Sequence, residues 1–293
     1  MGGQMALLAL VNMLWGMSFI WSKHALVAGF STMTLAFVRY AMAAVCLLLF
    51  QLARRERLRL RREDAVRMAV SGMVGMGLYY ILEYNGLSRT STISASLILG
   101  AIPILTMVAE AFLDRQSLGR RQVAGALVSL AGVALVVLSG TGEGQDSLLG
   151  DLFILGAGVT WVIYIFLSRR LRGSYSSLTM NTWQSLFAVA ALAPLAATEG
   201  CDLSAIPWDG WACAMVLAVV CSALCYYLYG LVISEMSPLA SAIFINLIPL
   251  TTMVGSVLLL GEALSWPSAA GGVLIIGSIF LVNLPGKPGG GKA

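Results

Sequence analysis

IPILTMV at residues 102–108 returns later in the chain as IPLTTMV at residues 248–254. The prolines of the two copies, Pro103 and Pro249, are separated by 146 residues, which is about half of the 293-residue chain. Each copy lies inside an apolar run that is long enough to span a bilayer. A proline removes a helix hydrogen bond where lipid supplies no water to replace it, so both positions are expected helix breaks. Matched breaks in two halves indicate the gated binding site of a transporter, while kinks that only serve packing are the other interpretation.

The composition of the chain excludes an ordinary soluble protein. Hydrophobic residues make up 59% of the chain and charged residues 11%, and the mean hydropathy is +0.87. Soluble domains carry about 25% charged residues. The predicted fold class is therefore an all-α polytopic membrane protein. The net charge of +4 does not indicate a nucleic-acid partner, because the basic residues fall in the loops between apolar runs.

Ten transmembrane helices are predicted from the need for about 20 apolar residues per span. They are expected at residues 4–22, 32–52, 65–85, 91–112, 121–138, 149–168, 177–197, 210–230, 239–260 and 267–284. Five spans fall in each half, and an odd number forces the second half to enter the membrane the opposite way. The prediction is therefore two inverted five-helix repeats around a central cavity.

The domain boundaries follow from this count. The first five-helix repeat is expected at residues 1–140, an external linker at 141–148, the inverted second repeat at 149–285 and a disordered tail at 286–293. Basic clusters follow the second, fourth and sixth predicted helices, while the loops on the other side carry mainly acidic residues. By the positive-inside rule, both termini are expected in the cytoplasm.

Several short motifs carry a resemblance to a known family. They are LWGMSF at 14–19, FVRYAMAA at 37–44, LGEAL at 260–264 and GGVLIIG at 271–277. In order and spacing they resemble the signatures of the EamA family in the drug/metabolite transporter superfamily. The resemblance implies ten helices in two inverted repeats, a central cavity and the export of small metabolites across the bacterial inner membrane. Within the family, the chain looks most like the aromatic amino-acid exporters of the YddG type.

Two positions depart from the family pattern. The first half has Gln116 where the second half has Glu262 of the LGEAL motif. The second half has Val162 after its tryptophan, where the first half has a glycine. These departures leave the predicted fold unchanged but weaken any argument that the two halves act identically.

Two tryptophans are the first candidates for the wall of the cavity. Trp15 and Trp161 lie near the middle of their predicted helices and are also separated by 146 residues. Interfacial tryptophans belong at helix ends, so a matched mid-membrane pair favours two walls of one cavity over core packing. Asn12 and Phe19 share a helical face with Trp15, and Tyr164 shares one with Trp161.

A second group of candidates lies on the predicted third, fourth, eighth and ninth helices. Aromatic side chains there could stack on a substrate or belong to the belt at the membrane surface. Polar side chains are expected to face the protein interior, since a polar group in lipid is costly. These cavity candidates are Tyr79, Tyr80, Glu83, Ser94, Tyr227 and Asn246.

Arg39 and Glu83 are predicted to form a structural charge pair. Arg39 lies about two turns inside the second predicted helix, where a charge costs about 2.5–3.5 kcal/mol on insertion scales. Glu83 lies near the same level on the third predicted helix. Because intramembrane charges usually pair, this interpretation is favoured over direct contact of Arg39 with a substrate.

The sequence predicts neither a metal site nor a cofactor nor catalysis. Most of the five cysteines lie in or beside apolar runs, and one histidine leaves too few ligands for a metal. The glycine-rich stretch 140–144 lacks the Lys-Ser/Thr ending of a phosphate loop. No hydrolase or metalloprotease motif is present, so the chain is not expected to be an enzyme.

The leading hypothesis is a secondary transporter that exports small metabolites, most plausibly aromatic or other neutral amino acids, by alternating access. Sugar phosphates, nucleotide sugars or drugs are the alternative substrates. Phosphate substrates favour several basic groups, and Arg39 is the only base well inside a predicted span. An intramembrane enzyme or a channel is a less favoured alternative. The expected partners are a small-molecule substrate and the lipid bilayer, and the oligomeric state stays open, with a monomer among the options.

Overall fold

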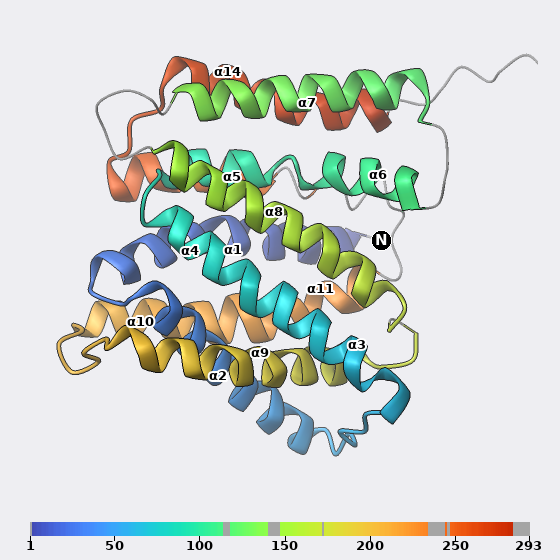
Figure 1. Ribbon diagram of the computed structural model, residues 1–293, viewed down its shortest axis with the longest axis vertical. Helices are drawn as coiled ribbons and strands as arrows, with labels where there is room; N and C mark the ends of the chain where they lie inside the picture. Colours follow the sequence, from blue (N-terminus) through green and yellow to red (C-terminus); the bar gives the residue numbers. More distant parts are fainter. Residues whose placement is uncertain are drawn as a thin grey trace, which may run out of the picture.

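The computed structural model describes residues 2–113, 118–139, 147–171, 173–233, 244 and 247–283 (Figure 1). Every regular element within these ranges is a helix. The α-helices are α1 (Gly2–Val27), α2 (Thr32–Ala53), α3 (Arg62–Gly72), α4 (Tyr79–Leu87), α5 (Thr92–Leu99), α6 (Ile102–Leu113), α7 (Arg120–Ser139), α8 (Leu148–Arg169), α9 (Ser177–Glu199), α10 (Trp208–Val216), α11 (Cys225–Ile233), α13 (Leu247–Gly255) and α14 (Trp266–Asn283). Three π-helical segments, η1 (Met73–Leu78), η2 (Leu217–Leu224) and η3 (Ser256–Leu260), continue directly from α-helices.

The described helices are those of a polytopic membrane protein. Seven helical stretches within the described residues are long and apolar enough to cross a bilayer. They are Gly3–Val27, Thr32–Ala53, Arg62–Leu87, Thr92–Leu113, Arg120–Leu138, Leu148–Arg169 and Trp208–Leu231. Two shorter apolar helices span Leu247–Leu260 and Trp266–Val282. Linker residues 141–146, the tail 286–293, Gln116 and Asn246 lie outside the described residues.

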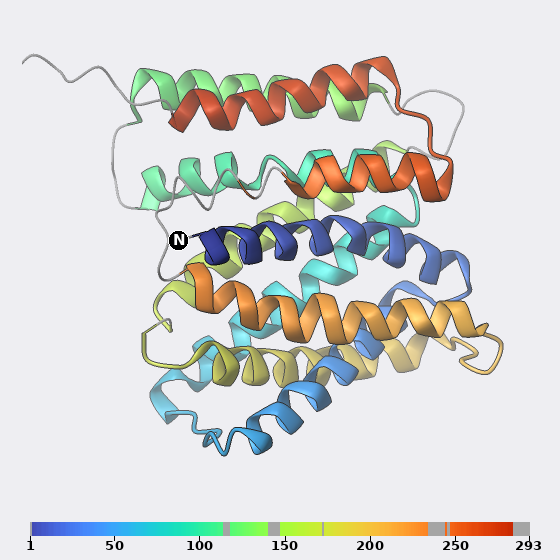
Figure 2. The same cartoon turned by 180° about the vertical axis from the view of Figure 1, so that it is seen from behind.

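The helices pack mainly in pairs that combine one element from each half of the chain. α7 and α14 lie side by side along one edge of the bundle, and α2 and α9 lie together towards the opposite edge (Figures 1 and 2). Between these pairs, α4 packs on α8 and α1 packs on α13. The core is therefore assembled across the two halves rather than within each of them.

Successive long helices run in opposite directions across the bundle. α1, α3, α7 and α9 begin at one end, which we call the N-terminal face, and α2, α5, α8 and α10 begin at the other end, the distal face (Figure 1). Carboxylates cap two of the helices that begin at the distal face. Glu199 accepts hydrogen bonds from the backbone N–H groups of Met33 and Thr34 at 3.1 and 2.8 Å. Glu262 accepts bonds from the first two backbone N–H groups of α5 at 2.9 and 3.2 Å, and such caps suit the positive end of a helix.

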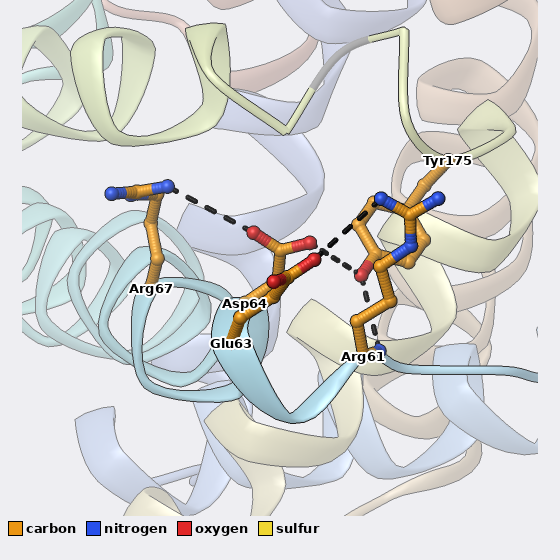
Figure 3. A network of polar contacts seen from close by, with 5 residues as sticks. All are labelled: Arg61, Glu63, Asp64, Arg67 and Tyr175. Carbon is orange, nitrogen blue, oxygen red and sulfur yellow. Dashed lines mark hydrogen bonds and ion pairs between the residues drawn. The ribbon is translucent and has the colours of Figure 1, made fainter.

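A polar network at the N-terminal face ties the start of α3 to the segment before α9 (Figure 3). The Tyr175 hydroxyl donates to the Asp64 carboxylate at 2.8 Å and accepts the backbone N–H of Arg61 at 3.2 Å. Arg67 forms an ion pair with Asp64 at 3.8 Å. Arg61 forms one with Glu63 at 3.7 Å. Both ion pairs include an arginine with a solvent-accessible side chain, so each contributes little stability and the network mainly fixes the position of α3.

Glycines allow close approach of helices where two of the pairs meet. A Cβ atom on Gly16 of α1 would lie 2.7 Å from the carbonyl oxygen of Ile248 and 2.8 Å from the side chain of Thr251. A Cβ atom on Gly132 of α7 would lie 2.8 Å from the carbonyl oxygen of Gly271 on α14. Small residues at such contacts are typical of helix packing in membranes, where dispersion contacts drive association.

Candidate functional site

A cavity of about 110 Å³ lies between helices of both halves of the chain. Its wall is made by residues of α1, α4, the junction of α5 and α6, α8, α11 and α13. The lining residues that the sequence analysis had singled out are Trp15, Phe19, Tyr79, Tyr80, Glu83, Trp161 and Pro249. The structure thus brings seven candidates, from widely separated parts of the sequence, to one enclosed space.

The predicted span 91–112 is interrupted at the cavity. α5 ends at Leu99, a turn follows at Gly100 and Ala101, and α6 begins at Ile102 with Pro103 in its first turn. A first-turn proline is tolerated because its missing N–H has no helical partner there. Pro249 lies in α13, whose described part begins at Leu247. The α5–α6 break exposes non-helical backbone at Gly100 to the cavity, which is where a membrane protein tolerates it.

Aromatic rings from both halves form most of the cavity wall. The Trp15 ring lies 5.3 Å from the ring of Tyr226 and 5.1 Å from that of Tyr229. On the facing side, the Trp161 ring lies 5.1 Å from Tyr79 and 6.1 Å from Tyr226. These centroid distances and tilted geometries are those of favourable aromatic pairs. The wall is therefore a continuous aromatic surface rather than a set of isolated rings.

The π-helical segment η2 holds two of the key side chains in place. The indole N–H of Trp15 donates to the carbonyl oxygen of Cys221 at 3.1 Å. The Nε of Arg39 donates to the Ser222 hydroxyl at 2.7 Å. A π-helical turn departs from the i→i−4 bonding pattern, and such turns are frequent at functional sites. Here the turn presents a carbonyl and a hydroxyl to two different neighbouring helices.

Arg39 lies behind the cavity wall and is fully buried. Besides its bond to Ser222, its Nη1 donates to the Tyr84 hydroxyl at 2.8 Å. The guanidinium carbon lies 4.2 Å from the centroid of the Tyr80 ring, which is a cation–π distance. Arg39 does not line the cavity. Its contacts instead hold the side chains of Tyr80 and Tyr84 on α4 in place.

The predicted charge pair between Arg39 and Glu83 is not formed as an ion pair. None of the ion pairs within 4.0 Å in the described part of the chain joins these two residues. Two donor groups of Arg39 are directed to the hydroxyls of Ser222 and Tyr84 instead. Glu83 lines the cavity, although only 3% of its surface is exposed. The carboxylate is therefore part of the cavity wall and makes no direct ion pair with Arg39.

Two candidates, on the first and fourth predicted helices, lie outside the cavity lining. Asn12 is fully buried, and its amide nitrogen donates to the carbonyl oxygen of Leu8, one turn earlier in α1. Ser94 lies in the first turn of α5, where its backbone N–H donates to the capping hydroxyl of Ser91. Both side chains are thus part of helix packing in the described residues.

Two tyrosines also lie away from the cavity lining. Tyr164 packs behind Trp161 at a ring distance of 5.0 Å, and its hydroxyl lies 3.4 Å from the side-chain oxygen of Gln184. Tyr227 packs on Phe50 of α2 at 5.2 Å. The ninth-helix candidate, Asn246, lies outside the described residues.

The lining includes residues that the sequence analysis did not select. They are Ser18, Leu99, Gly100, Ile102, Tyr226, Tyr229 and Ile248. The repeat itself contains a signal for two of them, because Tyr226 and Tyr229 follow Tyr80 and Glu83 by the same 146 residues. Applying that spacing to every candidate would have identified both tyrosines.

Other features of the described residues do not compete with this cavity. No group of three or more His, Cys, Asp or Glu side chains there could hold a metal ion. A second hollow lies at the surface of the N-terminal face and is lined by residues 58–62, Ala65 and Trp183. It contains none of the predicted cavity residues and borders the polar network of Figure 3.

Comparison with known proteins gives a consistent result over both halves of the chain. The model of the EamA-like transporter family matches residues 3–138 and 148–284. The transporter YvbV of Bacillus subtilis is 30% identical over 286 residues, which cover 96% of this chain and 92% of that protein.

A probable terminal-alkyne amino-acid exporter of Streptantibioticus cattleyicolor is 24% identical over 223 residues, 76% of this chain and 74% of that protein. A crystal structure with 21% sequence identity superposes with a TM-score of 0.67 and covers 96% of this chain and 98% of its own. At that identity the superposition shows a shared fold alone.

Proposed function

The chain belongs to the EamA-like transporter family, and from this premise we propose that it is a secondary transporter that exports small metabolites, namely aromatic or other neutral amino acids, across the bacterial inner membrane. The observation that carries the proposal is the cavity, whose wall is built by helices of both halves around the α5–α6 break. Concave, mostly apolar sites with few polar groups are typical of small-molecule binding.

The proposed architecture is ten spans in two inverted five-helix repeats, with both termini in the cytoplasm. Contacts that recur at matched positions support it. Arg39 of α2 bonds to Ser222 of η2. At a spacing of 146 residues, Arg39 corresponds to Ser185 and Ser222 to Met76. The Ser185 hydroxyl of α9 lies 3.7 Å from the sulfur of Met76 in η1, so the corresponding residues are also in contact. A contact that is repeated in this way is expected when the two halves share one fold and pack about a two-fold axis.

The orientation can be tested by cysteine labelling in a Cys201→Ser background. Ser204→Cys, between α9 and α10 at the distal face, should react with a membrane-impermeant maleimide in intact cells. Arg57→Cys, between α2 and α3, should react only after permeabilisation. The reverse pattern would contradict cytoplasmic termini.

The proposed mechanism is alternating access around the cavity. The α5–α6 break allows the segments on either side of it to move as separate pieces, and Pro249 occupies the matched position in the second half. The two halves would rock about the cavity, which is then open to one side of the membrane at a time. No nucleotide-binding motif is needed for such a facilitator, so downhill export is its simplest mode.

Aromatic or other neutral amino acids are the proposed substrates. The wall offers aromatic surface for an apolar side chain and polar groups for the backbone of an amino acid. The relative from Streptantibioticus cattleyicolor is named as a probable amino-acid exporter, which agrees with this choice. Sugar phosphates are a poorer match, because no Arg or Lys of the described part of the chain lines the cavity, and Lys23 donates to the carbonyl oxygens of Leu87 and Thr90.

The test is a flux assay with purified protein in liposomes. Labelled phenylalanine, tryptophan and leucine should leave loaded vesicles faster than from protein-free vesicles, and unlabelled amino acid outside should accelerate exchange. Flux of glucose 6-phosphate without any flux of amino acids would replace the proposed substrate class. Rates far above those of carriers would instead indicate a channel.

A further inference from the structure

Among the described residues, Glu83 is the only Asp, Glu, Lys, Arg or His that lines the cavity. It comes from α4 and is almost completely buried. No ion pair within 4.0 Å reaches it from the described residues. A buried carboxylate without a directly bonded cation is costly, and the cost falls when a positive group arrives beside it.

Arg39 does not remove this preference. The guanidinium lies behind the wall, where it donates to the hydroxyls of Ser222 and Tyr84. A molecule in the cavity therefore contacts the Glu83 carboxylate directly and does not contact the guanidinium of Arg39. The guanidinium is covered by the Tyr80 ring, which lies against it.

The aromatic wall has the same electrostatic preference. The faces of aromatic rings carry the negative part of a quadrupole and attract ammonium groups within about 6 Å of the ring centroid. Trp15, Trp161, Tyr226 and Tyr229 supply four such rings to the lining of the cavity that Glu83 also lines. Rings around a carboxylate form a site for an ammonium group, and the same rings repel an anion.

We propose that the cavity selects substrates by a protonated amino group, which binds beside Glu83 within the cage of Trp15, Trp161, Tyr226 and Tyr229. The inference rests on the proposed export function and narrows its substrate class to molecules that carry a free amine. Amino acids enter through their ammonium group, and simple aromatic amines without a carboxylate are ligands too. Acids that lack the amine, and N-acylated amino acids, are excluded.

Three compounds with the same ring separate these classes. Phenethylamine carries the amine alone, phenylalanine carries both charged groups, and 3-phenylpropionate carries the carboxylate alone. Calorimetric titration of the purified full-length protein should show binding of the first two, with 3-phenylpropionate at least about tenfold weaker. Equal or tighter binding of 3-phenylpropionate overturns the inference, and this comparison needs no variant.

A variant series assigns the effect to Glu83. Glu83→Gln should weaken phenethylamine binding by at least about tenfold, whereas Glu83→Asp should retain part of it. Glu110→Gln is the matched control, because Glu110 pairs with Arg169 at the surface at 3.5 Å and does not line the cavity. Unchanged phenethylamine affinity in a folded Glu83→Gln protein overturns the role of Glu83.

Flux in liposomes distinguishes this inference from the proposed function. Binding of phenethylamine and phenylalanine without flux of either supports the amine site and contradicts export. Equal flux of phenylalanine and N-acetylphenylalanine supports export and overturns selection by the amine. Flux of phenylalanine and phenethylamine without flux of N-acetylphenylalanine supports both.

Discussion

The two halves of the cavity wall match in their aromatic residues and differ in their charges. At a spacing of 146 residues, Trp15 corresponds to Trp161 and Tyr80 to Tyr226, and the hydroxyls of the last two approach within 3.4 Å. Glu83, in contrast, corresponds to a tyrosine, Tyr229. The repeat therefore explains the aromatic frame, and the carboxylate belongs to the first half alone.

The same difference holds behind the wall. Arg39 on α2 bonds to Ser222, while the corresponding residue on α9 is Ser185, which contacts the sulfur of Met76. In both halves the residue at this position contacts a π-helical segment, η2 in one case and η1 in the other. Only the first half has a buried cation, Arg39, at this position. The comparison teaches that a shared scaffold can carry a site whose charge is one-sided.

The largest expected effect is the loss of the buried cation. Arg39→Met removes the bonds to Ser222 and Tyr84 and leaves both hydroxyls without that partner, so we expect a loss of about 1.5–3 kcal/mol of stability. Ser185→Ala, at the corresponding position, should cost about 1 kcal/mol or less, since only a weak contact to sulfur is lost. Unfolding of the purified proteins in detergent measures both, and equal small losses would show that the two halves do not differ in this respect.

Moving the carboxylate to the other half is the next test. Glu83→Gln should reduce the affinity for phenethylamine about tenfold, which corresponds to about 1.4 kcal/mol. Adding Tyr229→Glu should restore part of that affinity, because position 229 lines the same cavity from the other side. Titration of the single and double variants measures the effect. A double variant no better than Glu83→Gln would mean that the two positions do not face one ligand.

The matched tryptophans should differ modestly in their contribution to stability. Trp15→Phe loses the indole bond to the Cys221 carbonyl, for which we expect about 0.5–1.5 kcal/mol beyond the loss of ring area. Trp161 makes no side-chain hydrogen bond within the described residues beyond its ring contacts, so Trp161→Phe should cost less. Denaturant unfolding in detergent compares the two variants. A larger loss for Trp161→Phe would contradict the anchoring role of η2.

The smallest expected effect concerns the tyrosines that meet at the centre. Their hydroxyl oxygens are 3.4 Å apart, longer than the usual O–H···O distance of about 2.7–2.8 Å. Tyr80→Phe and Tyr226→Phe should therefore show a coupling below about 0.5 kcal/mol in a double-mutant cycle. A coupling well above that value would indicate a tight bond between the halves, in which the matched tyrosines act as a latch.

Much of the fold was accessible from the sequence because it depends on local chemistry. Long apolar runs predict the membrane helices, and seven of the described helices have the length and apolarity of a span. Of the two repeated prolines, Pro103 follows the interruption between α5 and α6, and Pro249 lines the cavity. These features follow from hydrophobicity and from the missing N–H of proline, which need no knowledge of neighbours.

The rest depends on tertiary contacts. Tyr227 was predicted for the cavity, yet Tyr226 lines it, because the π-helical η2 lies just before α11 and shifts the register of its faces. The bond from Arg39 to Ser222 joins residues 183 positions apart, and no local pattern indicates it. The sequence therefore pointed to Glu83, the nearest acidic residue at the same predicted level, as the partner of Arg39. Neither the π-helical turn nor the partner of a buried arginine is encoded in a local pattern.

The most direct test of this account is flux through a protein whose cavity has been filled. Ser18 lines the cavity on α1, so Ser18→Phe places a ring in the space of about 110 Å³ between the two halves. The account predicts that phenylalanine flux in liposomes is lost while the thermal unfolding of the variant stays close to that of the unaltered protein. Unaltered flux through a folded Ser18→Phe protein would contradict the central claim that substrates pass through this cavity.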